Sequence, residues 1–302
     1  MRPRLLALLA LAALPTPARA PLTAARVTIL LSQESPAYRA AAEGFRAELA
    51  GRGYRVELDI RAAVPGPDQA RQLRASPPDL VLALGGPAAT SAAQLGGIPL
   101  VALVLRRAEF ARLGAATGVY LEFPAELELQ WLKRVLPNAR RVGVVFNPAE
   151  NAQVVSHAET VALGLGLELV ARKVDSRERL PDALASLAND VQVVWGIADT
   201  LVLTPETARS FLLFQFRQRI PFAGLSESWV KAGSLYALDR DWADLGRQCA
   251  ELADQLLRGR DARTLDPQSP RRVLLSLNRG TAQSLRLALP AETLRLAKDP
   301  TR

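Results

Sequence analysis

The chain of 302 residues contains one cysteine and one histidine. A single cysteine cannot form a disulfide within the chain, and so few thiols and imidazoles exclude a metal site built from these groups. A catalytic mechanism that pairs serine or cysteine with histidine would have to use His157. The sequence therefore lacks most of the side chains of acid–base and nucleophilic catalysis, and we expect no enzyme activity, no cofactor and no bound metal.

Long apolar segments are missing as well, and the one short run lies at the N-terminus. Ten apolar residues, 5–14, follow Arg2 and Arg4 and precede the small-x-small sequence Ala18-Arg19-Ala20. This pattern is typical of a secretory signal peptide, because ten helical residues span about 15 Å of a hydrocarbon core that is about 30 Å thick. We expect cleavage after Ala20 and export to the periplasm.

The basic charge is smaller than it first looks. The formal net charge is +8, but residues 1–20 carry three arginines and no acid, so the mature chain has a net charge of +5. An exported protein meets little nucleic acid, and no later segment is apolar for long enough to cross a bilayer. We expect a soluble monomer with no nucleic-acid partner.

Short apolar runs alternate with helical patterns through the first part of the chain. Ser35-Pro36 can cap and begin a helix that Gly51 and Gly53 end. Strands that alternate with helices predict an α/β domain with a parallel sheet. The predicted strands are residues 26–32, 55–60, 79–85 and 98–105.

The same order of patterns returns about 115 residues later. Residues 141–147 match 26–32, residues 190–196 match 79–85, and residues 220–225 match the start of the run at 98. This repeat predicts two similar Rossmann-like lobes with parallel sheets, joined by a hinge. The predicted boundaries are 21–121 plus 227–264 for the N-terminal lobe, and 122–226 plus 265–302 for the C-terminal lobe.

Open parallel sheets bind ligands at the carboxyl ends of their strands. If these ends face each other in the two lobes, one ligand would sit in the cleft between them. Hinge closure around that ligand would be the natural motion.

An ordered series of short motifs runs through nearly the whole mature chain. The most specific block is Leu136-Pro137-Asn138-Ala139, followed by Val142-Gly143-Val144 and Asn147-Pro148. The other motifs are Ala42-Glu43-Gly44-Phe45, Pro78-Asp79-Leu80-Val81-Leu82-Ala83, Thr117-Gly118-Val119, Ile220-Pro221-Phe222, Lys231-Ala232-Gly233-Ser234-Leu235 and Leu245-Gly246-Arg247-Gln248.

With these motifs the chain resembles the ABC-transporter substrate-binding family whose better-known members take up tryptophan or other aromatic amino acids. That family is similar to the type I periplasmic binding proteins. The resemblance implies a periplasmic solute-binding component of an ABC import system, which hands a small molecule to a permease in the inner membrane. A periplasmic sensor that presents its closed state to a signalling receptor is the alternative.

The resemblance also implies that loops at strand ends hold the ligand. Free N–H groups at helix N-termini can bind a carboxylate, and Asp199 or Glu227 can receive an ammonium group. The alternative for Ser35, Asn147 and Asp199 is that they only cap helices or turns. The predicted ligand-binding residues are Gln33, Glu34, Ser35, Gly86, Pro87, Ala88, Arg106, Asn147, Asn151, Trp195, Asp199, Thr200, Ser226 and Glu227.

Two positions depart from the family pattern. Arg106-Arg107 stands where the family usually has an acid followed by proline, and Asp199-Thr200 stands where it has Asp-Asn. An arginine that faces the cleft would favour an anionic ligand, whereas an arginine on the rim would only be solvated. The ligand is therefore predicted only as amino-acid-like or a small carboxylate.

Overall fold

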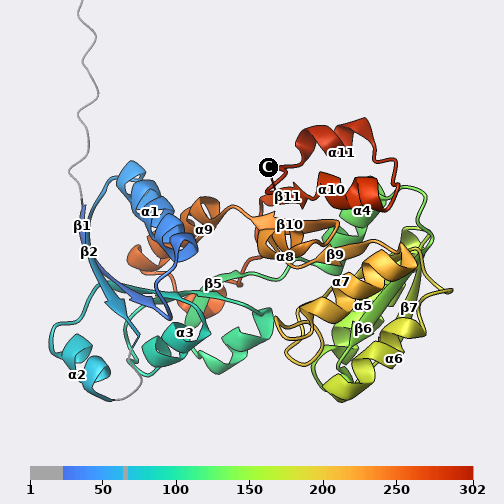
Figure 1. Cartoon of the computed structure of the whole chain (residues 1–302). Coiled ribbons are helices and arrows are strands. Elements are labelled where there is room, and N and C mark those ends of the chain that lie inside the picture. The colour runs from blue at the N-terminus through green and yellow to red at the C-terminus, as the bar shows by residue number, and fades with distance from the viewer. Residues whose placement is uncertain (1–22, 64–66, 302) are drawn as a thin grey trace, which may run out of the picture.

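The computed structural model describes residues 23–63 and 67–301, and the predicted signal peptide lies outside the described residues. The chain forms two lobes that lie side by side, each built around its own sheet (Figure 1). Within the described ranges, no helix combines the length and the apolar character needed to span a membrane.

The first lobe contains a five-stranded sheet in the order β2-β1-β3-β4-β5, and all of its strands are parallel. β3 and β4 are buried along their whole length, which explains their unbroken apolar sequences. The strands are β1 (Thr23–Leu31), β2 (Tyr54–Ala62), β3 (Leu80–Leu84), β4 (Leu100–Val104) and β5 (Ala116–Tyr120). The helices are α1 (Pro36–Gly51), α2 (Pro67–Ala75), α3 (Gly86–Ala93) and the short 3-10 helix η1 (Arg107–Arg112).

The second lobe contains a six-stranded sheet in the order β11-β10-β9-β8-β6-β7, in which only β11 runs antiparallel to its neighbour. Its strands are β6 (Arg141–Phe146), β7 (Glu168–Lys173), β8 (Val193–Trp195), β9 (Phe222–Gly224), β10 (Tyr236–Arg240) and β11 (Val273–Leu277). Its helices are α4 (Ala125–Val135), α5 (Pro148–Gly164), η2 (Arg177–Arg179), α6 (Leu180–Ala185), α7 (Ala208–Gln218), α8 (Glu227–Ala232), α10 (Arg279–Ser284) and α11 (Ala291–Leu296).

The two sheets repeat one topology. β1, β3 and β4 hold the same places in the first sheet as β6, β8 and β9 hold in the second. These are the strands that the sequence repeat paired with each other, and the order matches that of doubly wound α/β folds. The predicted fold class, two similar lobes with largely parallel sheets, is confirmed.

The return of the chain to the first lobe comes later than the predicted residue 227. α8 and β10 remain with the second sheet, because β10 pairs with both β9 and β11. α9 (Trp242–Leu257) and the short η3 (Ala262–Thr264) pack on the first lobe, and the chain stays there beyond the predicted boundary at 265, because Leu265 lies in the same core and Gln268 pairs with Val119 of β5. Residues 227–241 therefore belong with the second sheet, and the prediction for this segment was wrong. The hydrophobic pattern of β10 is too short to mark it as a strand.

α9 lies against α1 through two glycines whose backbones approach closely (Figure 1). A Cβ at Gly44 would collide with the backbone of Ala243, and a Cβ at Gly246 would collide with the backbone of Ala41. Phe45 and Cys249 are fully buried in the same core, and burial raises the pKa of the cysteine thiol to about 12. Cys249 is therefore a free thiol buried in the core of the first lobe.

Candidate functional site

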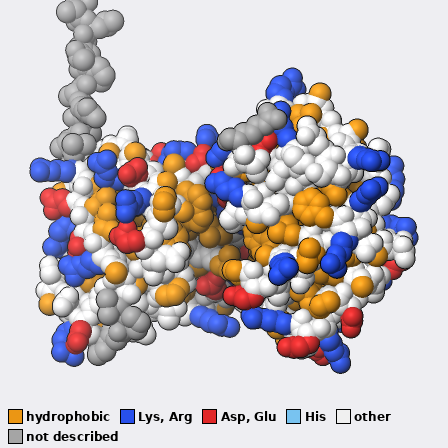
Figure 2. Space-filling view, viewed as in Figure 1, with side chains coloured by type: hydrophobic (Ala, Val, Ile, Leu, Met, Phe, Trp, Pro, Cys, Tyr) orange, Lys and Arg blue, Asp and Glu red, His pale blue; other side chains and the backbone are white. Residues whose placement is uncertain are grey.

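A pocket of about 260 Å³ lies where the carboxyl ends of the two sheets meet, and we call it the hinge pocket. Figure 2 shows a hollow between the lobes with hydrophobic side chains on both of its walls. The first lobe contributes residues that follow β4 and end β5. The other lining residues come from the second lobe and from residues 121–124 between β5 and α4, which we call the crossing segment. The lining residues are Leu105, Arg107, Tyr120, Glu122, Phe123, Pro124, Ala125, Glu126, Glu128, Asn151, Val154, His157, Trp195, Ile197, Ala198, Leu225 and Arg240.

Glu128 is the most unusual group in the hinge pocket. It lies on α4, and its Oε2 accepts a hydrogen bond of 2.8 Å from Nε1 of Trp195 at the end of β8. Burial raises the pKa of the Glu128 carboxyl from 4.5 to about 7, although Trp195 and Arg240 oppose the change. The group is therefore ready to exchange a proton near neutral pH.

Arg240, at the end of β10, connects the crossing segment to the second sheet by hydrogen bonds. Its Nε donates to the carbonyl of Leu121 at 2.8 Å, and its Nη1 donates to the carbonyl of Leu225 at 3.2 Å. The guanidinium also lies 4.7 Å from the centre of the Phe123 ring, within the range of a cation–π contact. Two of the five N–H groups of its guanidinium are thus used by the protein itself.

Arg106 reaches from the first lobe to the second. Its Nη2 pairs with Oε1 of Glu150 on α5 and donates to the carbonyl of Ala198 at 3.1 Å. The other oxygen of Glu150 accepts hydrogen bonds from the backbone N and the Oγ1 of Thr200, at 3.0 and 2.8 Å. Arg106 therefore faces the second lobe, and its charge is matched there by a carboxylate.

Asp199 is the centre of a buried network in the second lobe and is 4% exposed. Its carboxylate accepts hydrogen bonds from the backbone of Asn147, the side chain of Asn151 and the backbones of Leu201 and Val202. Asn147 in turn caps α5, because its Oδ1 accepts from the backbone of Ala149. The capping interpretation describes both residues, since the network uses their polar atoms to hold the loops together.

The corresponding loops of the first lobe are also closed by their own side chains. Ser35 caps α1 by accepting from the backbone of Tyr38, and the Oγ of Ser32 accepts from the backbone of Ala88 at the start of α3. Gly85 has a φ of 100°, which favours glycine, and so places Gly86, Pro87 and Ala88 at the turn into α3.

The remaining predicted residues lie outside the hinge pocket. Gln33 is exposed, and Glu34 forms an ion pair of 3.2 Å with Arg39 at the surface. Ser226 is hydrogen-bonded to Ser228, and Glu227 pairs with Lys231 and Lys298 and lines a different hollow. Of the predicted residues, only Asn151 and Trp195 line the pocket itself, with Arg106, Asp199 and Thr200 in the network beside it.

Five charged residues of the pocket were absent from the predicted set: Arg107, Glu122, Glu126, Glu128 and Arg240. Glu122 and Arg240 lie where the chain passes between the lobes, after β5 and at the end of β10, and Glu128 within α4 has the sequence pattern of an ordinary surface residue. The position of a residue at the carboxyl end of a strand is the one sequence signal that could have pointed to Glu122 and Arg240, because such residues line clefts of this kind.

His157 lines the hinge pocket and pairs with a carboxylate. Its Nε2 pairs with Oε1 of Glu126 at 2.7 Å, and its side chain is 60% exposed. Ser226 bonds to a neighbouring serine instead of to the imidazole. Among residues 23–63 and 67–301, no three histidine, cysteine or acidic side chains come together in a way that could hold a metal ion.

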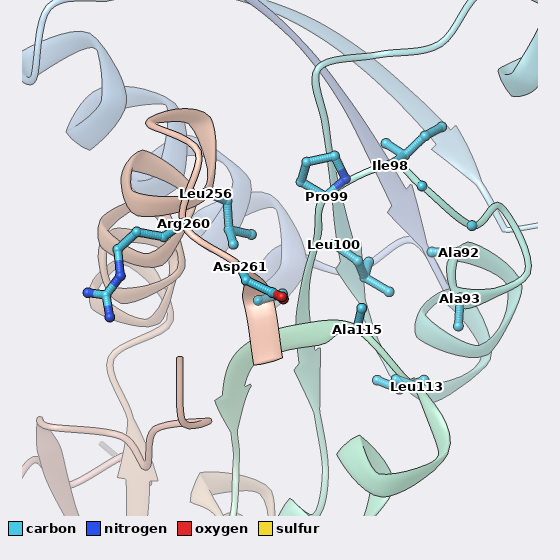
Figure 3. Close-up of a pocket in the computed structure, with 13 residues that line it drawn as sticks. Ala92, Ala93, Ile98, Pro99, Leu100, Leu113, Ala115, Leu256, Arg260 and Asp261 are labelled. Carbon is cyan, nitrogen blue, oxygen red and sulfur yellow. The ribbon is translucent and has the colours of Figure 1, made fainter. Parts of the chain in front are cut away.

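A different hollow of about 250 Å³ lies in the first lobe near the start of β4 (Figure 3). Leu256, Arg260 and Asp261, at and beyond the end of α9, lie across it from Pro99 and Leu100 (Figure 3). This hollow is lined by one lobe, at the amino ends of the strands, so lobe closure would not enclose a molecule there.

Comparison with known proteins gives a consistent result. Residues 26–300 match the family model for the ABC transporter substrate binding protein. The tyrosine-binding protein of Clostridioides difficile (strain R20291) is 24% identical to this chain over 187 residues, which are 61% of this chain and 53% of the relative. The match therefore spans about half of that relative's length.

Two solved structures share the fold. One is the ligand-free, open structure of a substrate binding protein with adhesive properties from Clostridium difficile, with 20% identity and a TM-score of 0.76 over 91% of this chain and 99% of that chain. The other is a domain from Streptococcus pneumonia in complex with L-Trp, with 19% identity and a TM-score of 0.63 over 92% and 99%. Both likenesses support the two-lobed architecture.

Proposed function

The chain belongs to the ABC transporter substrate binding protein family, and from this premise we propose that it binds a small molecule in the hinge pocket. Closure of the two lobes would then present the loaded protein to a permease of an ABC import system. The signal-peptide pattern at residues 1–20 supports a periplasmic location, and the match to a tyrosine-binding protein supports an amino-acid-sized ligand.

The observation that carries this proposal is the position of the hinge pocket. It lies at the carboxyl ends of both sheets and takes its walls from both lobes and from the crossing segment. A ligand in this place touches more protein when the lobes close, so it stabilises the closed form by its differential affinity for the two forms.

The first test is a thermal-shift screen with amino acids, aromatic amines, purines and small carboxylates. A ligand present at about 100 times its Kd stabilises the folded protein by about 2.7 kcal/mol, which corresponds to a rise in Tm of about 5–10 °C. If no compound raises the Tm, the proposal is wrong.

A matched pair of variants on α5 tests the location. Val154 lines the hinge pocket, so Val154→Trp should fill it and abolish the shift caused by the compound found in the screen. Leu163 is 74% exposed on the same helix and does not line the pocket, so Leu163→Trp should keep the shift. Binding that survives in Val154→Trp would place the ligand elsewhere.

A further inference from the structure

We propose that Glu128 holds a protonated amine of the ligand, and that the ligand also has an apolar or aromatic body. This inference rests on the proposed function, since it concerns the chemistry of the same hinge pocket. It makes the amine, which the sequence alone assigned to Asp199 or Glu227, the group that Glu128 recognises.

The first step is the free oxygen of Glu128. Among the described residues, Trp195 Nε1 is the one hydrogen-bond donor to this carboxylate, and it binds Oε2. Oε1 remains on a wall of the pocket without a protein donor. A desolvated carboxylate in this state favours a partner that brings its own positive charge or N–H groups.

The second step is the character of the surrounding walls. Tyr120, Phe123 and Trp195 contribute aromatic surface, and Ile197 and Leu225 contribute aliphatic surface. A volume of about 260 Å³ suits one small ring-bearing molecule rather than a peptide or an oligosaccharide. A ligand with one charged end and one apolar end matches this lining.

The third step compares the places where a charged ligand group could bind without displacing a protein partner. Arg106 is paired with Glu150, and two of the five N–H groups of Arg240 donate to backbone carbonyls. The N-termini of α3 and α5 are closed by Ser32 and Asn147. A ligand carboxylate at Arg106 or at these two helix N-termini would have to displace an internal partner, whereas an amine would meet the free Oε1 of Glu128.

The charges around Glu128 set the pH dependence of binding. Arg240 favours its ionised form, Glu122 disfavours it, and the buried hydroxyl of Tyr236 stays neutral because burial and Glu128 raise its pKa. His157 and Glu126 form their own pair at the rim. Since the Glu128 carboxyl titrates near pH 7, a cationic ligand should bind about tenfold more weakly at about pH 6 than at about pH 8.

Three probes of one shape test the inference by calorimetry: tyramine, which has only the amine; 3-(4-hydroxyphenyl)propionate, which has only the carboxylate; and L-tyrosine, which has both. We expect the wild-type protein to bind tyramine and not the propionate. Glu128→Gln keeps the volume of the side chain and should weaken tyramine binding at least tenfold and remove its pH dependence. Glu159→Gln, at an exposed site on α5 outside the pocket, is the control and should change neither.

Binding of the propionate without tyramine, wild-type tyramine affinity in Glu128→Gln, or no tyramine binding at all would each overturn the inference. The failure of the proposed function is a different result. In that case the broad screen finds no ligand, or Val154→Trp still binds the ligand that was found. The two failures are therefore distinguishable.

Discussion

The two lobes share one strand order but differ in what stands at the carboxyl ends of their strands. In the first lobe single hydroxyl groups such as those of Ser32 and Ser35 close the loops at these ends. In the second lobe they carry the buried Asp199 network, and Glu128 and Arg240 lie beside it. The comparison teaches that the second lobe and the crossing segment build the pocket, whereas the first lobe covers it and reaches over with Arg106.

The largest expected effect is on the network of the second lobe. Asp199→Ala would leave four donors without their acceptor inside a buried loop, so we expect the free energy of unfolding to fall by about 3–5 kcal/mol. Ser32→Ala removes a single acceptor from the first lobe and should cost about 1 kcal/mol. Urea unfolding of both variants measures the difference, and equal losses would refute the contrast between the lobes.

The next effect concerns α9, which follows the second sheet in sequence but packs on the first lobe. Gly246→Ala would push a methyl group into the backbone of Ala41, and we expect a loss of about 1–3 kcal/mol. Gly51→Ala, at the end of α1 in open space, should change stability by less than about 1 kcal/mol. Hydrogen exchange should show the loss in β1 rather than in β6. Equal loss in both strands would mean that the lobes do not unfold separately.

The parts of this molecule that the sequence predicted are those that depend on local patterns. Apolar runs located β1, β3, β4 and β6 but not β5, β10 or β11, the residue types of Ser35 and Asn147 located helix starts, and the repeat located the second lobe. Glu128 could not be found in this way, because only the packing of α4 under Trp195 buries its carboxylate. The pairing of Arg106 with Glu150 was equally hidden, since it depends on how the two lobes meet.

A smaller effect is expected on the pH dependence of the free energy of unfolding, which should differ between a carboxyl group of the second lobe and one of the first. Burial raises the pKa of Glu128 to about 7, so its protonated form favours folding, and this contribution is lost as the pH rises from about 4.5 through about 7. We expect Glu128→Gln to be more stable than the wild-type protein at pH 8 by about 1–2 kcal/mol, and the advantage should vanish at acid pH.

Asp254 on α9, which packs on the first lobe, should change the stability with pH in the opposite direction to Glu128. Burial tends to raise its pKa, but hydrogen bonds from Arg258 and Tyr54 outweigh this and lower it. Its stabilising contribution is therefore lost as the pH falls through its own lowered value. The urea midpoint of Glu128→Gln should rise above the wild-type value between about pH 4.5 and about pH 7, whereas that of Asp254→Asn should lie below the wild-type value at neutral pH and approach it at acid pH. A Glu128→Gln curve parallel to the wild-type curve, or an Asp254→Asn curve that does not approach it at acid pH, would contradict the assignment of the two carboxyls.

The smallest effect tests the contact between the lobes. Arg106 and Glu150 have side chains that are 21% and 13% exposed, so their pairing is partly shielded from water, and a double-mutant cycle with Arg106→Ala and Glu150→Gln should give a coupling of about 1 kcal/mol. Because the pair holds the lobes together, its loss should lower the population of the closed form and weaken ligand binding about fivefold. Arg112→Ala, an exposed arginine at the end of η1, serves as the control and should leave affinity unchanged. Small-angle scattering of the ligand-free protein should show a larger radius of gyration for Arg106→Ala than for Arg112→Ala. If both variants scatter and bind alike, the first lobe does not act through Arg106, and closure must depend on the ligand and the crossing segment alone.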